Sequence, residues 1–157
     1  MMRNHATPNI PDASAAGTWL VVYALSIIYV SLTPFTGWTD TDTLLSLWPR
    51  WPRYITFFDV LINVLAYVPL GLFAYIFLQP RLGPKSAAFF SVLAGFFLSL
   101  AMETSQQYLP TRISSMVDLL ANTGGAALGV ALTAWFAWTP QLQIVGNLRD
   151  RIFIKGR

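Results

Sequence analysis

Residues 57–78 read FFDVLINVLAYVPLGLFAYIFL, and Asp59 is the only charged residue in this stretch. The hydrocarbon core of a bilayer is about 30 Å thick, and about 20 mostly apolar helical residues are needed to cross it. The stretch therefore predicts a transmembrane helix. Three further stretches have a similar length and composition, and we expect four spans: residues 17–35, 57–78, 86–109 and 117–138.

The composition of the whole chain supports this interpretation. Of the 157 residues, 55% are hydrophobic and only 11% are charged, whereas a soluble domain carries about 25% charged residues. The predicted spans are also apolar around most of their circumference, unlike the half-buried helices of a soluble bundle. The sequence therefore predicts one all-α integral membrane domain over residues 1–157, a bundle of four transmembrane helices.

Several kinds of site are excluded by composition. The chain has no cysteine, and its single histidine, His5, lies in a polar leader. The sequence therefore lacks the residues needed for a disulfide framework, a thiolate nucleophile, a Cys/His metal site or a Ser-His-Asp triad. We expect no metal and no cofactor, and the sequence identifies no catalytic residue. The net charge of +3 lies on no basic helix, so nucleic acid is not expected as a partner, whereas anionic membrane lipid is.

The distribution of basic residues predicts the orientation. An uncleaved first span and four spans in all place both termini on one side, together with the connection over residues 79–85. Seven lysines and arginines lie on that side: Arg3, Arg81, Lys85, Arg149, Arg151, Lys155 and Arg157. The opposite side has three: Arg50, Arg53 and Arg112. The positive-inside rule therefore predicts that both termini are cytoplasmic.

Two connecting segments have patterns of their own. Trp48-Pro49-Arg50 is repeated as Trp51-Pro52-Arg53, which indicates an anchor at the membrane interface, where tryptophan is enriched. Alternatively, Arg50 and Arg53 bind a phosphate of a lipid-linked molecule while the indoles pack on it. After the fourth span, residues 139–157 show helical spacing of apolar residues among basic ones. They predict an amphipathic helix that lies on the cytoplasmic surface of the membrane.

Ionisable residues inside spans are costly and usually mark function. Three spans each carry an acid followed at helical spacing by an amide, so that each pair shares one helix face. The pairs are Asp59 and Asn63, Glu103 and Gln106, and Asp118 and Asn122. All three pairs lie toward the side of the membrane opposite the termini. We therefore expect one shared polar pocket that faces outward.

Structural interpretations compete with this pocket. Thr56-x-x-Asp59 and Ser115-x-x-Asp118 both fit a capping box, and the asparagines fit hydrogen bonds between transmembrane helices. Glu103 lies near the C-terminal end of its helix, where the helix dipole disfavours negative charge. Arg112 is its expected partner, either as a structural ion pair or within a ligand-binding pocket.

Small and kinking residues are expected to shape the helix packing. Gly125-x-x-x-Gly129 lets a neighbouring backbone approach closely, mainly within the bundle, with self-association into a homo-oligomer as the alternative. Pro69 and Gly71 are expected to kink or loosen the second span just beyond Asn63.

The run from residue 103 to residue 129 reads E-x-x-Q-x-x-x-P-x-R-x-x-S-x-x-D-x-x-x-N-x-x-G-x-x-x-G. Its spaced positions are Glu103, Gln106, Pro110, Arg112, Ser115, Asp118, Asn122, Gly125 and Gly129. This run resembles the signature of the VanZ-like family of small bacterial membrane proteins. An upstream block on Asp59, Asn63, Pro69 and Gly71 looks like the other common block of that family.

The resemblance implies a role in the cell envelope at the bacterial inner membrane. The family takes its name from a protein of glycopeptide-resistance clusters that lowers sensitivity to teicoplanin. Together with the polar cluster, this favours a protein that binds or modulates a lipid-linked envelope molecule or a lipophilic glycopeptide antibiotic. In that hypothesis Arg112 holds an anionic group, and Glu103 compensates Arg112 or binds a hydroxyl or amine. The amides Asn63, Gln106 and Asn122 donate hydrogen bonds to the ligand.

Other functions use the same residues. Paired carboxylates could act as general acid and base in a membrane-embedded hydrolase or transferase on a lipid-linked glycan or phospholipid. A proton- or ion-coupled transporter is a third hypothesis, although its acids cluster at one end of the spans. A structural accessory subunit is a fourth.

Overall fold

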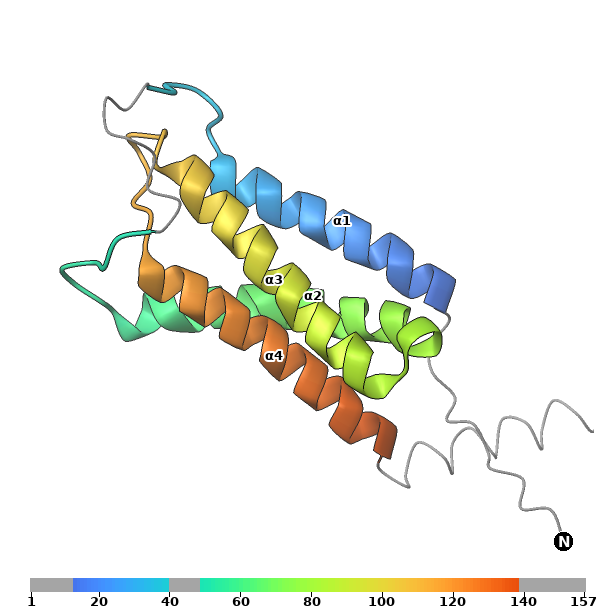
Figure 1. Cartoon of the computed structure of the whole chain (residues 1–157). Coiled ribbons are helices and arrows are strands. Elements are labelled where there is room, and N and C mark those ends of the chain that lie inside the picture. The colour runs from blue at the N-terminus through green and yellow to red at the C-terminus, as the bar shows by residue number, and fades with distance from the viewer. Residues whose placement is uncertain (1–12, 40–48, 139–157) are drawn as a thin grey trace, which may run out of the picture.

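The computed structural model describes residues 13–39 and 49–138, and the regular elements within these residues are α-helices (Figure 1). The four helices are α1 (Ala13–Leu32), α2 (Phe57–Leu82), α3 (Pro84–Gln106) and α4 (Met116–Trp138). All four are long and apolar enough to cross a membrane, which confirms the predicted number and approximate positions of the spans. His5, Trp48 and the predicted amphipathic helix over residues 139–157 lie outside the described residues.

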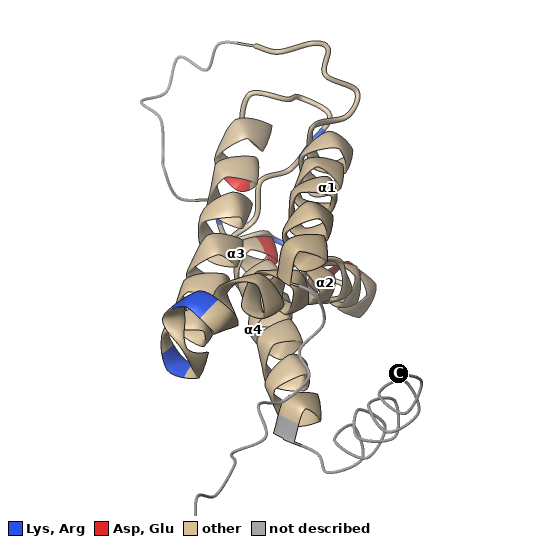
Figure 2. Cartoon of the chain, turned by 90° about the vertical axis from the view of Figure 1, so that its right-hand side faces the viewer, with Lys and Arg blue, Asp and Glu red and all other residues tan. Residues whose placement is uncertain are grey.

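The connections divide the bundle into two ends. The α1–α2 and α3–α4 connections lie together at one end, called here the loop end, and the α2–α3 turn lies at the other (Figure 1). The described helices carry few charged residues, and the acidic ones lie away from the α2–α3 turn (Figure 2). The polar residues of α2, α3 and α4 singled out in the sequence therefore share the loop half of the bundle.

Large apolar side chains cover the outside of the helices. Trp19 of α1, Phe57 of α2, Phe97 of α3 and Trp135 of α4 are all more than half exposed. In water such a surface would be strongly unfavourable, because exposed apolar area costs about 25 cal/mol per Å². In a bilayer the same side chains contact lipid tails, so the exterior is that of a multi-pass membrane protein.

Local sequence explains where helices begin and end. α1 ends at Leu32, just before Thr33-Pro34, because the residue preceding a proline is disfavoured in the helical conformation. α2 begins after Thr56, whose side chain accepts a hydrogen bond from the backbone N–H of Asp59 at 3.1 Å. Both ends lie within a few residues of the predicted span boundaries.

The connection between α2 and α3 is shorter than predicted. Instead of a loop over residues 79–85, α2 continues through Pro80 to Leu82 and α3 begins at Pro84. Gly83 alone joins them, with a φ of 75° that favours glycine. Proline at the first position of a helix loses no hydrogen bond, and therefore α3 starts directly after the glycine.

Glycines bring α2 and α4 into backbone contact. A Cβ atom added to Gly125 would lie 2.2 Å from the carbonyl oxygen of Val64, and one added to Gly129 would lie 2.0 Å from that of Val68. From the other side, a Cβ on Gly71 would lie 2.0 Å from the carbonyl oxygen of Ala126. The Gly125-x-x-x-Gly129 face is thus occupied within the chain, by α2.

Candidate functional site

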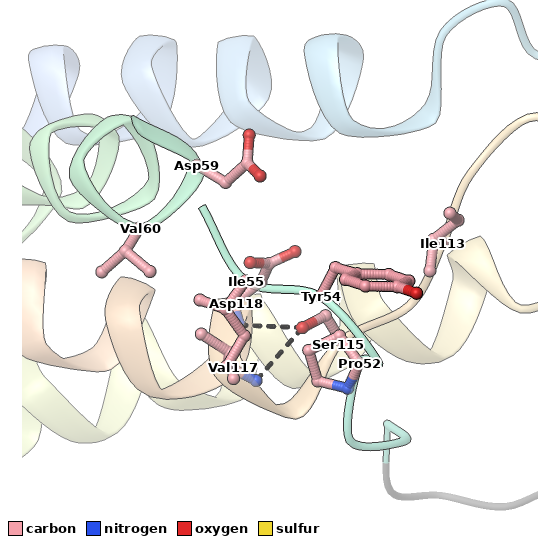
Figure 3. Close-up of a pocket in the computed structure, with 9 residues that line it drawn as sticks. All are labelled: Pro52, Tyr54, Ile55, Asp59, Val60, Ile113, Ser115, Val117 and Asp118. Carbon is pink, nitrogen blue, oxygen red and sulfur yellow. Dashed lines mark hydrogen bonds between the residues drawn. The ribbon is translucent and has the colours of Figure 1, made fainter. Parts of the chain in front are cut away.

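A pocket of about 160 Å³ opens at the loop end between the start of α2 and the start of α4 (Figure 3). Its lining combines two carboxylates and two hydroxyl groups, those of Tyr54 and Ser115, with mainly apolar side chains. The lining residues are Pro52, Tyr54, Ile55, Asp59, Val60, Ile113, Ser115, Val117 and Asp118. Of the predicted site residues, the pocket therefore brings together Asp59 and Asp118.

Asp59 takes part in the N-terminal cap of α2. The hydroxyl of Thr56 accepts from the Asp59 backbone N–H and donates to the Asp59 carboxylate. An acid in the first turn also favours the positive end of the helix dipole. The N-cap role of Thr56 is therefore confirmed, while the Asp59 carboxylate binds the Thr56 hydroxyl, is exposed and also lines the pocket.

The N-terminus of α4 is capped in a different way. Ser115 Oγ accepts from the backbone N–H groups of Val117 at 3.2 Å and Asp118 at 3.4 Å. The backbone N–H of Ser115 itself donates to Glu103 Oε2 at 2.7 Å, and that of Met116 donates to the carbonyl of Arg50 at 2.9 Å. A capping box would use the Asp118 carboxylate for the Ser115 N–H. Here the Glu103 carboxylate of α3 accepts that hydrogen bond instead.

The carboxylate of Asp118 is consequently free of the cap. It is half-buried, lies beside the side chain of Asn63 on α2, and lies within electrostatic reach of Asp59. Figure 3 shows it on the pocket wall, opposite the start of α2. The amide of Asn63 thus approaches Asp118 from the neighbouring helix, while the carboxylate lines the pocket.

Glu103 is the buried carboxylate of the site, with 4% of its surface exposed. Its charge lies at the positive end of the α4 dipole, and its Oε2 accepts the first backbone N–H of the α4 cap. The Ser115 N–H and the positive end of the α4 dipole therefore compensate the acid at the C-terminal end of α3. The predicted pairing of Glu103 with Arg112 is wrong, because Glu103 binds the α4 terminus instead.

Arg112 is directed toward α1. Its guanidinium donates to the carbonyl of Val30 at 2.8 Å and twice to that of Thr33, at 3.1 and 3.3 Å. Gln106 likewise donates to the carbonyl of Ser31 at 3.1 Å. A cation at the C-terminal end of a helix satisfies its last carbonyls and its dipole. Gln106 and Arg112 therefore hold α1 in place, and the structure does not bring them to the pocket.

Asn122 lies deeper in the bundle than the pocket. It is 5% exposed, and its Nδ2 donates to Ser99 Oγ at 2.9 Å. This is a hydrogen bond between α4 and α3, of the kind that joins transmembrane helices. The predicted cluster of seven residues therefore divides into a pocket group, a buried group and a group that binds α1.

The connection over residues 49–55 supplies one wall of the pocket. The backbone of Arg50 pairs with that of Ser115 in an isolated parallel β-bridge, which places Tyr54 and Ile55 beside the start of α4. The side chains of Arg50 and Arg53 are exposed. Sequence analysis did not identify Tyr54 or Ile55, and no local pattern marks them, because they line the pocket only through this long-range backbone pairing.

The pocket is suited to neutral or cationic polar groups. Two carboxylates accept hydrogen bonds from hydroxyl and ammonium groups and repel phosphate. The α4 N-terminus beside it offers little to an anion, since its first N–H groups already have partners. Within the described residues there is no group of three or more His, Cys, Asp and Glu side chains that could hold a metal ion.

Comparison with known proteins agrees with this architecture. The family model described as VanZ/LLP1 matches residues 10–137, a range that includes all four helices except the last residue of α4. No curated protein and no solved structure gives a significant match to the chain.

Proposed function

The chain belongs to the VanZ/LLP1 family, and from this membership and its pocket we propose that it is a binding protein of the bacterial cell envelope. In this proposal the pocket between α2 and α4 takes the polar head of an amphiphilic molecule. Candidate ligands are a lipid-linked envelope molecule and a lipophilic glycopeptide antibiotic. The protein would bind or sequester this ligand at the membrane surface.

The observation that carries the proposal is the state of the Asp118 carboxylate. Glu103 has taken over the capping of Ser115, so the Asp118 carboxylate is not used by the cap, although it lies in the first turn of α4, where the helix dipole favours an acid. Burying part of an ionised group is costly without hydrogen-bond partners, and the polar side chain beside it on α2 is the amide of Asn63. A hydroxyl or ammonium group of a ligand would supply the hydrogen bonds that the carboxylate still accepts.

The chemistry of the pocket lining narrows the class of ligand that the pocket is expected to bind. The apolar residues Ile55, Val60 and Ile113 favour contact with a hydrocarbon or sugar face. The two carboxylates favour sugar hydroxyls and amino groups over phosphates. A phosphate of the same amphiphile would instead lie near the exposed side chains of Arg50 and Arg53, outside the pocket. This replaces the anion-binding role first predicted for Arg112, whose donors point to α1.

The proposal includes an orientation. The excess of lysine and arginine on the side of the termini favours cytoplasmic termini, and the loop end then faces outward across the inner membrane. An outward pocket at the level of the lipid headgroups would meet lipid-linked precursors and antibiotics on the side where envelope assembly takes place.

The test is co-purification with a matched set of variants. The protein is extracted in a mild, lipid-retaining detergent, and bound small molecules are identified by mass spectrometry. Asp118→Asn removes the charge but keeps the shape of the side chain, so we expect the bound amphiphile to be lost while yield and elution volume stay unchanged. Lys85→Gln changes an exposed charge at the opposite end and serves as the control. If Asp118→Asn retains the same molecules as wild type, the pocket is not the binding site.

One observation favours a second function, that of an acid/base enzyme. Asp59 and Asp118 line the same pocket within electrostatic reach of each other, and a coupled pair of carboxylates can serve as general acid and base. An enzyme would change the lipid composition of cells, whereas a binding protein would not. Extracts of cells that produce wild type or Asp59→Asn would therefore differ in a lipid-linked species only if the pocket catalyses a reaction.

A further inference from the structure

A second polar cluster lies between α2, α3 and α4, deeper in the bundle than the pocket. It consists of Tyr67 from α2, Ser99 from α3 and Asn122 from α4, which are 3%, 0% and 5% exposed. Glu103 lies one helical turn from Ser99 on the same buried face of α3 and within electrostatic reach of Tyr67. Glu103 is bound to the pocket wall through the backbone N–H of Ser115.

The hydrogen bonds of this cluster are incomplete. Asn122 Nδ2 donates to Ser99 Oγ, but the Asn122 carbonyl oxygen has no partner among the described residues. The Tyr67 hydroxyl lies beside Ser99 without hydrogen-bond geometry and also has no partner there. A tyrosine hydroxyl cannot reach the backbone of its own helix, unlike a serine or threonine hydroxyl. Two strong hydrogen-bonding groups of residues that both lie beside Ser99 are thus buried without a partner among the described residues.

Such groups are rarely left unpaired. An unsatisfied buried polar group costs about 1–3 kcal/mol, and a membrane provides no solvent around the bundle to relieve this cost. Internal water binds where two to four polar partners converge. Three polar groups could bind such a water. The Tyr67 hydroxyl supplies a donor, and the Asn122 carbonyl oxygen and Ser99 Oγ supply acceptors.

We propose that Tyr67, Ser99 and Asn122 form a binding site for internal water inside the bundle. The water accepts a hydrogen bond from the Tyr67 hydroxyl and donates one to the Asn122 carbonyl oxygen. Glu103, one turn from Ser99 on α3, lies within electrostatic reach of Tyr67, and its Oε2 accepts from the backbone N–H of Ser115 on the pocket wall. The charged or titratable groups within reach of this Glu103 are Tyr67 and Asp118.

Hydroxyl-radical footprinting by X-ray pulses tests the site, because radicals formed from a bound water modify the side chain that the water contacts. The full chain is irradiated in lipid nanodiscs, and modified tyrosines are quantified by mass spectrometry. Tyr75 is the internal control, since it lies on the same helix, is 6% exposed and packs among apolar side chains. We expect Tyr67 to be modified several-fold faster than Tyr75. Equal, slow modification of both tyrosines would overturn the proposal.

Two variants separate bound water from general solvent penetration. Ser99→Ala and Asn122→Leu each remove one polar partner of the water while keeping the helix positions filled. We expect the modification rate of Tyr67 to fall toward that of Tyr75, while Tyr75 itself is unchanged. A Tyr67 rate that stays at the wild-type level in both variants would show that no water is held by these groups. If Asn122→Leu does not fold, Ser99→Ala and the wild-type ratio still decide the outcome.

Discussion

The partners of Glu103 and Arg112 can be distinguished by a double-mutant cycle. Their spacing in the sequence predicts an ion pair, whereas in the structure Glu103 binds the N-terminus of α4 and Arg112 binds the C-terminus of α1. Residues that share no partner contribute independently to stability. We therefore predict that the effects of Glu103→Gln and Arg112→Ala add.

The magnitudes follow from the contacts. Glutamine keeps an oxygen that accepts from the Ser115 N–H. It loses the attraction between the charge and the helix dipole, worth about 1 kcal/mol, but it also removes the cost of burying that charge, so the net loss is at most about 1 kcal/mol. Arg112→Ala removes the hydrogen bonds to the carbonyls of Val30 and Thr33. Because the guanidinium is exposed, water replaces much of this energy, and the net loss is about 1 kcal/mol. The double variant should lose at most about 2 kcal/mol of unfolding free energy, a fall in Tm of no more than roughly 6 °C for a chain of this size.

Thermal unfolding in detergent, followed by the fluorescence of the six tryptophans, measures all four corners of the cycle. We expect the sum of the single effects to match the double effect within about 0.5 kcal/mol. As a further comparison, Glu103→Ala leaves the Ser115 N–H without a partner and should cost about 2 kcal/mol more than Glu103→Gln. A double variant no less stable than the worse single variant would mean that Glu103 and Arg112 form an ion pair after all.

Two further predictions concern packing and orientation. Gly125→Leu should greatly reduce the yield of folded protein, because even its Cβ would meet the α2 backbone. Gly124→Leu should fold, because a Cβ atom added at Gly124 would meet no atom of a neighbouring helix within 4 Å; similar yields of the two variants would contradict the α2–α4 contact. The chain has no cysteine, so a single cysteine placed at exposed Ile113 should react with a membrane-impermeant maleimide in intact cells, whereas one at Lys85 should react only after the cells are opened. The reverse pattern would invert the proposed orientation.

The sequence predicts the spans well because their signal is local. Each helix is recognised from its own run of apolar residues, and the N-cap of α2 is recognised from the spacing of Thr56 and Asp59. The single-residue turn at Gly83 was missed because residues 79–85 contain glutamine, arginine and lysine, which usually indicate a loop. Here the long polar side chains belong to the last turn of α2 and the first turn of α3.

The candidate site was predicted less completely. Its acids and amides were found because such residues are rare inside spans, but their partners were not. Glu103 binds a backbone N–H group, which has no signature in the sequence. Arg112 binds backbone carbonyls of a helix about 80 residues earlier in the chain. Helices that are apolar on all sides also leave their rotation undetermined, so the sequence could not show which polar groups face one another.

The direct backbone contact of α2 with α4 has a consequence for transport. Where Gly71 and Gly125 meet the opposing main chain, and Gly95 of α3 lies close to Ala126, no space is left between these three helices for a further side chain. A solute could pass between α2 and α4 at this level only if their main chains moved apart. We would therefore expect a ligand held in the proposed pocket to leave by the side from which it entered.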